Sequence, residues 1–367
     1  MVGGGPAGCA AAFFLARNGA RPLLLEKNTS PQSKVCGEVL SSTALGVLEE
    51  MGVTPRALGA APITRILFCA GCQKMEYSLR HPRLALSRTR LDEAIQNAAR
   101  RAGAEVLPGL AVQGLVTESD GTVLQTSAGA IKAVRILWAS GKRDHPFLPA
   151  RQGGESGWLG LKPHLRLPEH QRQRLEGLLE MHLLASGYVG LCNVEAGLSN
   201  LCGLIRVSAF RGTGADSRAF LELLARQSPL LAQTLEQAET LTAKPLAVAA
   251  QPYGYLQKLT LPPKGLLRIG DQFAVFPPLC GEGMAAALLS GRLAGFSLAG
   301  KDDVSLKLAL RRGLAPPLRV ARWMHRGAAH PLVRTAILRL MARRPDILET
   351  LEKTMDPARG LLNIGVS

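Results

Sequence analysis

The alternation of apolar runs with glycine-rich turns predicts strand–turn–helix units at both ends of the chain. Small and apolar residues fill positions 6–18 at helical spacing, and Gly19 offers the left-handed conformation at which helices commonly end. The run RPLLLE that follows, residues 21–26, predicts a short buried strand. A second unit begins with an apolar strand at 266–269 and continues through a proline-rich loop into a helix rich in Ala and Leu. Units of this kind are typical of an α/β fold.

The middle of the chain has a different pattern, because short apolar runs alternate there with turn residues. The runs GWLGLKPHLRL, GYVGLCNVEAG and LSNLCGLIRVSAF predict a set of strands. The segments LPEHQRQRLEGLLE and ADSRAFLELLARQ predict helices, with Pro168 and Asp216 near their starts. We therefore expect a second lobe that is rich in β-sheet.

From residue 302 onward the pattern predicts helices. One face of the last long segment is apolar and holds Val333, Ile337, Leu340 and Met341. The same segment is basic and carries Arg334, Arg339, Arg343 and Arg344. A basic amphipathic helix suits either the surface of an anionic membrane or the flank of its own protein, and both interpretations stay open.

Length and charge narrow the class of protein. A chain of 367 residues exceeds what one hydrophobic core usually supports, so two lobes are expected. Lys and Arg number 44 against 28 Asp and Glu, a net charge of +16 that suits an anionic partner such as a phosphorylated cofactor or a membrane surface. Aromatic residues make up only 4% and no zinc-finger or basic-zipper spacing occurs, so a nucleic-acid partner is not expected.

The cysteines indicate reduced thiols. Their number, seven, is odd, and in a long chain without a signal peptide this favours a cytoplasmic location. Cys69 and Cys72 form a single CxxC without a second pair at zinc spacing, so no metal site is expected. The longest apolar segment carries Arg292 in its middle, which argues against a membrane-spanning helix.

The strongest chemical signal is the glycine pattern at the start, where Gly3, Gly5 and Gly8 fit G-x-G-x-x-G. The first glycine permits a tight strand-to-helix turn, the second lets backbone approach a pyrophosphate, and the third lets helix and strand pack closely. The helix that begins at Pro6 and Ala7 would offer N–H groups to the phosphates. Glu26 ends the next strand, at the spacing of a carboxylate that binds ribose hydroxyls, and Lys27 follows it.

The first strand of this unit is unusually short, because only two residues precede the glycines whereas strands average about five to six residues. We expect that the native start lies further upstream.

Several motifs together resemble one family. The N-terminal GGGPAG…E, the segment KVCGEVLS at 34–41, the segment LSRTRLDEAIQ, the turn ASG that follows RILW, and the distant GD…P…GEGM are similar to the glutathione-reductase-type flavoproteins. Within that superfamily the chain resembles the geranylgeranyl-reductase and aromatic-hydroxylase branch. The resemblance implies FAD bound in an extended form.

The resemblance also implies which residues lie at the FAD. Asp271, after Gly270, would bind the ribityl chain, and the helix amides near the flavin ring would stabilise its reduced form. The full set of expected cofactor residues is Gly3, Gly5, Pro6, Ala7, Gly8, Glu26, Lys27, Arg88, Gly141, Gly270, Asp271, Gly281, Gly283 and Met284.

The implied architecture is an α/β fold with a discontinuous Rossmann-like FAD-binding lobe, a β-sheet-rich substrate lobe and a helical C-terminus. The FAD lobe would comprise residues 1–60, 86–150 and 265–300. The substrate lobe would comprise 61–85 and 151–264, and the C-terminal helical region 301–367.

The sequence departs from each branch of the family. Aromatic hydroxylases carry an Asp-Gly motif tied to NADPH where this chain reads ASGKRD, and only one dinucleotide fingerprint exists, so NAD(P)H is expected only as a transient electron donor. Flavin halogenases carry W-x-W-x-I-P, which is absent here, so halogenation is not expected. Of the prenyl-reductase motif P-x-x-Y-x-W-x-F-P, only a remnant is left at 252–255.

Three chemistries stay open. The flavin could reduce or dehydrogenate a carbon–carbon bond in a small apolar or aromatic substrate, or it could hydroxylate one with NAD(P)H and O2. A non-enzymatic electron-transfer flavoprotein is the third option. The catalytic residues and the oligomeric state are not defined by the sequence, and the candidates for the substrate pocket are Cys36, Glu38, His164, Tyr188 and Tyr253.

Overall fold

A small parallel sheet forms the centre of the first lobe in the computed structural model, which describes residues 1–152, 157–259, 265–297 and 303–361. Its strands are β1 (Leu23–Glu26), β5 (Glu105–Pro108), β9 (Ile136–Trp138) and β17 (Leu266–Arg268). β1 pairs with β5 and β9 with β17, both in parallel. Val2 bridges Leu25 on one side and Trp138 on the other, so it joins the two pairs into one layer.

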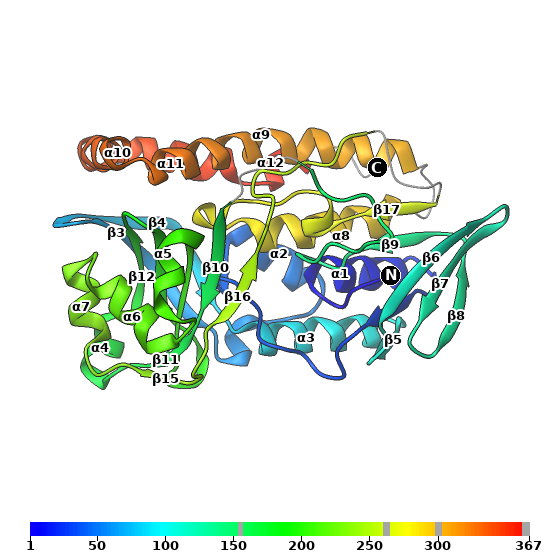
Figure 1. The fold of residues 1–367 in the computed structure, drawn as a ribbon. Helices are drawn as coiled ribbons and strands as arrows, with labels where there is room; N and C mark the ends of the chain where they lie inside the picture. Colours follow the sequence, from blue (N-terminus) through cyan, green and yellow to red (C-terminus); the bar gives the residue numbers. More distant parts are fainter. Residues whose placement is uncertain (153–156, 260–264, 298–302, 362–367) are drawn as a thin grey trace.

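Three helices surround this sheet: α1 (Pro6–Arg17), α3 (Arg88–Arg101) and α8 (Gly283–Ser297). α1 packs against both α3 and α8. The approach of α8 is close because a Cβ on Gly291 would lie 2.2 Å from the carbonyl oxygen of Ala7, and one on Gly295 would lie 2.5 Å from Cβ of Phe14. The glycines of α8 therefore allow α1 and α8 to pack closely, with their N-termini on the same side of the lobe (Figure 1).

An antiparallel three-stranded sheet extends from the first lobe, at the right of Figure 1. It consists of β6 (Val112–Glu118), β7 (Gly121–Thr126) and β8 (Gly129–Ala133). Leu124 of this sheet packs with Val2 and Trp138 in a small apolar cluster, which attaches the sheet to the parallel strands.

A ten-stranded sheet dominates the second lobe. Its main path runs β15 (Glu239–Thr240), β11 (His164–Arg166), β14 (Ser199–Arg206), β13 (Gly187–Asn193), β12 (Gly177–Leu183), β3 (Ala61–Ala70), β4 (Gln73–Ala85) and β2 (Val39–Leu40). β10 (Trp158–Lys162) pairs with β14 and with β16 (Leu246–Ala249). The strands predicted for the middle of the chain are thus confirmed, except that the last four residues of the run 198–210 form the short helix α5 (Val207–Phe210). β2 joins this sheet from within the segment 1–60 predicted for the FAD lobe.

One predicted helix is wrong in its second half. α4 (Glu169–Arg174) ends early, and residues from Gly177 onward form β12 instead of continuing the helix. β12 pairs with β3 at one edge and with β13 at the other. Its two faces pack into different apolar clusters, Leu178 in one and Leu179, Met181 and Leu183 in the other, and every residue from Leu178 to Leu183 is buried. A strand that is buried on both faces lacks the alternation of apolar and polar residues, so its sequence also fits a short helix.

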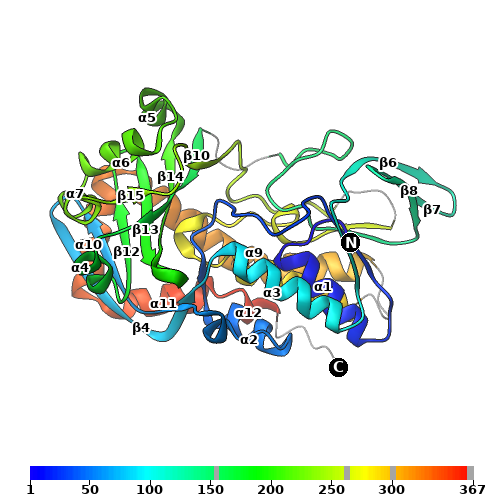
Figure 2. The ribbon, with the colours of Figure 1, turned by 90° about the horizontal axis from the view of Figure 1, so that it is seen from below.

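The two faces of the large sheet are covered differently. One face packs under α6 (Ser217–Ala225) and α7 (Pro229–Leu235), where Phe220 and Leu231 are fully buried. The opposite face carries a separate core cluster that includes Leu338 and Leu348 from the C-terminal region. Figure 2 shows α6 and α7 on the far side of the sheet from the C-terminal helices.

The C-terminal region is helical, as predicted: α9 (Asp303–Ala329), α10 (Pro331–Arg343), α11 (Pro345–Met355) and α12 (Ala358–Leu361). In Figure 1 these helices run along the top of the molecule over both lobes. The predicted apolar face of α10 is partly wrong, because Leu338 and Met341 are buried whereas Val333 and Leu340 are 40% and 52% exposed. Among the described helices none combines the length and the apolar character needed to cross a membrane.

Two further helices pack against α8. α2 (Ser42–Glu50) packs on α8, and the single-turn helix η4 (Gly270–Gln272) contacts α8 and α1. The division into lobes by residue stays a prediction, and its boundaries at 264–265 and 300–301, like the chain end at 362–367, fall outside the described residues.

Candidate functional site

A cavity of about 1190 Å³ connects the two lobes. It exceeds the roughly 300–1000 Å³ of ordinary ligand pockets, so it has room for an extended cofactor and a substrate together. All the residues expected to contact the cofactor line it except Gly8; they are Gly3, Gly5, Pro6, Ala7, Glu26, Lys27, Arg88, Gly141, Gly270, Asp271, Gly281, Gly283 and Met284. Gly5 and Asp271, which lie 266 positions apart in the sequence, thus face the same space.

The first glycine turn has the geometry that the motif predicts. Gly3 has φ +108°, and a Cβ there would lie 2.4 Å from the carbonyl oxygen of Ala139. A Cβ on Gly8 would lie 1.9 Å from the oxygen of Gly3, which explains why Gly8 packs behind the cavity wall. Gly5 is open, since its nearest neighbour would be Arg88 at 3.7 Å. The N-cap of α1 is Gly5, which has no side chain to cap the helix, so the first N–H groups are available to an anion.

Glu26 reinforces this turn and keeps capacity for a ligand. Its Oε2 accepts a hydrogen bond from the N–H of Gly4 at 2.8 Å, and its Oε1 accepts two from Asn28, at 3.0 and 2.8 Å. Because each carboxylate oxygen can accept two hydrogen bonds, Oε2 has one acceptor position left, and Glu26 lines the cavity. That position suits a hydroxyl donor such as a ribose OH.

Arg88 lies beside Gly5 and is held by Asp92, one turn further along α3. Arg88 donates to both oxygens of Asp92 at 3.0 Å, and Lys34 donates to Oδ2 at 2.6 Å. Burial alone would lower the pKa of Arg88, but the charge of Asp92 outweighs it and the pKa is raised. Two cations fixed by one buried carboxylate leave a net positive charge, which favours a phosphate near the N-terminus of α1.

The second glycine turn is tied to the loop that follows β9. Arg151 is buried and donates to Asp144 at 2.7 Å, to the carbonyl oxygen of Asp271 at 2.9 Å and to that of Lys142 at 2.6 Å. Gln272 donates to the carbonyl oxygens of Gly141 and Arg143, both at 2.7 Å. These bonds lock the turn at Asp271 against the ASG turn, so both present their backbone to the cavity.

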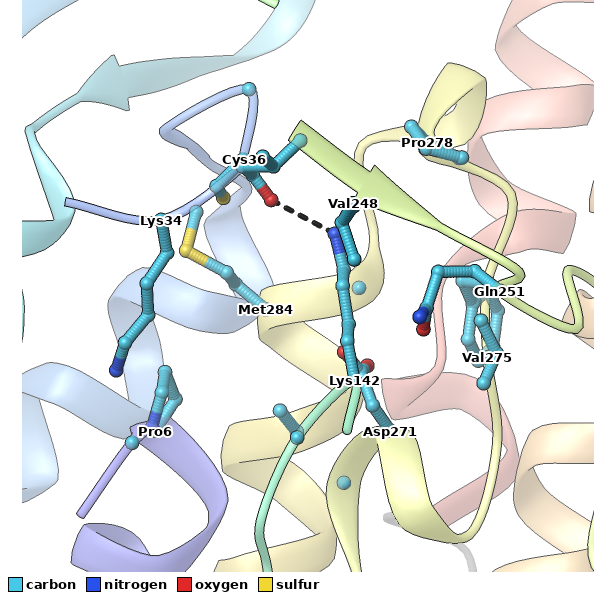
Figure 3. A pocket seen from close by; sticks show the side chains of 18 of the residues that line it. Pro6, Lys34, Cys36, Lys142, Val248, Gln251, Asp271, Val275, Pro278 and Met284 are labelled. Carbon is cyan, nitrogen blue, oxygen red and sulfur yellow. Dashed lines mark hydrogen bonds between the residues drawn. The ribbon is translucent and has the colours of Figure 1, made fainter. Parts of the chain in front are cut away.

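Lys142 extends into the middle of the cavity, as Figure 3 shows. Its Nζ donates to the carbonyl oxygen of Val35 at 2.8 Å. Burial alone would lower the pKa of Lys142, but the neighbouring Tyr253 and Asp271 outweigh it and the pKa is raised. The side chain is therefore a fixed cation between the two lobes.

A third turn, at the N-terminus of α8, closes the cavity on another side. Gly281 has φ +71°, and the helix begins at Gly283. Glu282 between them is buried and accepts a hydrogen bond from Ser41 at 2.8 Å, and burial raises the pKa of its carboxyl. Burial also raises the pKa of the Cys280 thiol to about 12, so that thiol stays protonated and inert.

Of the five predicted pocket residues, Cys36, Glu38 and Tyr188 line the cavity, whereas His164 and Tyr253 lie behind its wall. Glu38 is a left-handed residue with φ +61°, and its carboxylate is bound by Lys162, by His164 at 2.9 Å and by the N–H of Arg88 at 2.7 Å. Burial alone would raise the pKa of Glu38, but the hydrogen bond with His164 and the charge of Lys162 outweigh it and lower the pKa.

Tyr188 supports the loop before α8. Its oxygen accepts a hydrogen bond from the N–H of Leu279 at 3.2 Å. Burial raises the pKa of its hydroxyl well above the usual value, so Tyr188 is protonated at neutral pH.

The second half of the cavity is apolar. It lies between the large sheet, which contributes Phe68, Leu79, Leu179 and Met181, and α11, which contributes Leu348 and Leu351. We call this part the apolar arm. Its polar side chains are few, and three of them, Tyr77, Arg83 and Glu352, are grouped together.

Sequence reasoning did not identify Lys142, Arg151, Gln272 or Arg83. Lys142 directly follows the ASG turn and Gln272 directly follows Asp271, so adjacency to a motif was an available signal for both. Arg151 and Arg83 carry no local signal, because their roles depend on partners distant in the sequence. Among the described residues there is no cluster of three or more His, Cys, Asp or Glu that could hold a metal ion.

The sequence of this chain is similar to those of known proteins. A family model described as "FAD binding domain" matches residues 1–139. The chain is 26% identical to a menaquinone reductase of Mycolicibacterium smegmatis over 324 residues, covering 80% of this chain and 74% of that protein. It is 22% identical to conditioned medium factor receptor 1 of Dictyostelium discoideum over 330 residues, which cover 81% of this chain but only 62% of the length of that protein.

Solved structures share the fold at low sequence identity. A flavin-dependent brominase, Bmp2, superposes with a TM-score of 0.81 and 17% identity, covering 97% of this chain and 92% of that chain. A geranylgeranyl bacteriochlorophyll reductase-like protein from Thermoplasma acidophilum superposes with a TM-score of 0.73 and 16% identity, covering 99% and 97%. The predicted α/β fold is thereby confirmed.

Proposed function

The chain belongs to the FAD-dependent oxidoreductases of the glutathione-reductase type, and we propose that it reduces or dehydrogenates a carbon–carbon bond of an apolar organic substrate. The observation that carries the proposal is the apolar arm, which continues directly from the turns at Asp271 and Gly281. Similarity to a menaquinone reductase and to a geranylgeranyl reductase-like protein supports a substrate of this kind.

The residues of the cavity fit FAD in an extended form. The N-terminus of α1 would hold the pyrophosphate beside Arg88, and the free position on Glu26 would accept a ribose hydroxyl. Asp271 would bind the ribityl chain, and the turn at Gly281 and Gly283 would lie by the ring. When bound, FAD supplies reversible two-electron transfer to or from carbon.

The chain's own side chains would orient the partners of that transfer. Lys142 would hold a positive charge at the centre of the cavity, and Tyr188 would keep the loop at Leu279 in place. The apolar arm would exclude water and position the hydrocarbon part of the substrate. The electron donor we propose is NAD(P)H, which would bind transiently.

Hydroxylation or halogenation is the second candidate, because the brominase shares the fold. The product distinguishes the candidates. Reduced protein is mixed with a panel of prenyl lipids, polyketides and aromatic acids, once without O2 and once with O2 and bromide, and products are identified by mass spectrometry. A product that has gained two hydrogen atoms supports the proposal, whereas a product formed only with O2 that contains a new oxygen or halogen contradicts it.

We also propose that the exposed side of α10 brings the protein to anionic membranes that hold apolar substrates. Leu332 is 77% exposed, and Trp323 on the adjoining α9 is 79% exposed. Arg339 and Arg343 on α10 are exposed as well. Flotation with vesicles containing phosphatidylserine should recover the protein, and loss of this recovery in Trp323→Ser/Leu332→Ser would support the contact; no flotation of the wild type would refute it.

A further inference from the structure

Arg83 is an unusual residue for the place it occupies. It lies near the end of β4, is only 7% exposed, and lines the apolar arm of the cavity. A Cβ on Gly281 would lie 2.8 Å from its Nη1, so the guanidinium rests on the turn that precedes α8. A buried guanidinium must be matched by carboxylates or hydrogen-bond acceptors, because leaving it unmatched is costly.

The protein supplies hydrogen-bond acceptors to only part of this guanidinium. Nη2 lies 3.3 Å from Oε1 of Glu352 and 3.4 Å from Oε1 of Glu282. Both distances are long for a charge-assisted hydrogen bond, which is usually about 2.7–2.9 Å. In the part of the chain that the structure describes, Nε and Nη1 make no hydrogen bond, and neither is sealed away from the cavity. Arg83 therefore has donors available to a ligand.

The charges around Arg83 favour a neutral acceptor. Glu352 already balances the guanidinium, and Tyr77 lies with its hydroxyl 3.4 Å from Oε2 of Glu352. Glu282 is a second nearby carboxyl, and burial raises its pKa. An anionic ligand would add uncompensated negative charge in an apolar space, whereas a carbonyl oxygen would accept a hydrogen bond without adding charge.

We infer that Arg83 anchors a neutral carbonyl oxygen of the substrate, and that the substrate is an apolar molecule carrying a ketone or quinone carbonyl. This inference rests on the proposed function, because it names the substrate class of the same cavity. Arg83 determines specificity in this account: it selects among apolar molecules by the presence of the carbonyl, while the arm binds their hydrocarbon part.

Equilibrium dialysis of the FAD-loaded protein tests the inference with two matched probes, 2-methyl-1,4-naphthoquinone and 2-methylnaphthalene. The wild type should bind the quinone at least tenfold more tightly than the hydrocarbon. Arg83→Met should lose this preference and bind the hydrocarbon as before. Glu352→Gln keeps the guanidinium but removes the charge that balances it, so this variant should bind the anionic probe 2-naphthoate at least tenfold more tightly than the wild type does. Unchanged binding of 2-naphthoate would overturn the inference should Arg83→Met fold poorly.

The matched control is Arg80→Met, which changes the same residue type on the same strand. Arg80 pairs with Glu349 of α11 at 2.6 Å, but its side chain is 60% exposed and faces solvent, so the preference should not change. Retention of the preference in Arg83→Met overturns the inference. So does a shift in the reduction potential of the bound FAD without loss of preference, because Arg83 would then act on the flavin.

The two proposals fail in different ways. Wild-type protein that cannot retain FAD defeats the proposed function itself. Wild-type protein that retains FAD and forms a reduced product, yet binds both probes equally, leaves the function standing and overturns only the role of Arg83.

Discussion

The contact between α1 and α8 brings the first and third glycine turns together, and Gly291→Ala is the change that tests it. A Cβ at this position would lie 2.2 Å from the carbonyl oxygen of Ala7 and 2.9 Å from Cβ of Ala10. The first of these neighbours is backbone, so it cannot move aside as a flexible side chain could. The two helices must separate.

The expected magnitude follows from two opposing effects. Overpacking a tight contact costs about 1–3 kcal/mol, and the backbone clash places this site at the upper end. Replacing a glycine by alanine within a helix returns about 1 kcal/mol. The net loss in the free energy of unfolding is therefore about 2 kcal/mol. An unfolding entropy of about 2.1 cal/mol/K per residue gives about 1.3 °C per kcal/mol for 367 residues, so the melting temperature should fall by about 3 °C.

The affinity for FAD should fall as well, because separation of the helices moves Gly5 away from Gly281. We expect at least a tenfold weaker Kd, or about 1.4 kcal/mol. Thermal melting of the apoprotein by circular dichroism and fluorescence titration with FAD measure the two effects.

Gly46→Ala is the matched control. Gly46 is an exposed residue of α2, and nothing lies within 4 Å of a Cβ built there. This variant should be more stable by about 0.5–1 kcal/mol and bind FAD normally. If Gly291→Ala melts and binds FAD like the wild type, the two turns are not held together by this contact and the reasoning is refuted.

Further predictions concern individual side chains. Glu26→Ala should weaken FAD binding about tenfold or more, because a charge-assisted hydrogen bond is lost, while Glu49→Ala should not; unchanged titration of Glu26→Ala would exclude the ribose role. The pKa of Glu38 is lowered by folding, so its stabilisation is complete above the unfolded value of about 4.3 and is lost as pH falls through the lower folded value. In urea unfolding Glu38→Gln should be about 3–5 kcal/mol less stable than the wild type at pH 7, and a gap that does not narrow below about pH 4 would contradict the assignment. Iodoacetamide at pH 8 should alkylate Cys72, which is exposed, before Cys192, since burial raises the pKa of the Cys192 thiol to about 12; peptide mapping that shows the reverse order would contradict the burial.

The sequence predicts the parts of the fold whose signal is local. The G-x-G-x-x-G spacing, the helix after it and Glu26 follow one another within 26 residues, and the structure gives α1 and β1 there. The second half of the helix predicted over 167–180 is wrong because LEGLLE fits a buried strand as well as a helix, and only the pairing of β12 with β3 decides between them. That partner is more than a hundred residues away.

The parts of the site that could not be predicted depend on contacts between distant segments. Arg83 and Glu352 are 269 positions apart, and neither stands in a motif. Arg151 is a similar case, since its importance comes from the carbonyl oxygen of Asp271, 120 positions away. Tertiary packing brings these residues together, and neither periodicity nor composition predicts such contacts.

The most direct measurement is a crystal structure of the protein bound to FAD. The account predicts one FAD molecule along the cavity, with its pyrophosphate at the amide of Gly5 and its ribityl chain at Asp271. Density for a cofactor that reaches only one of these two residues, or that lies outside the cavity, would contradict it.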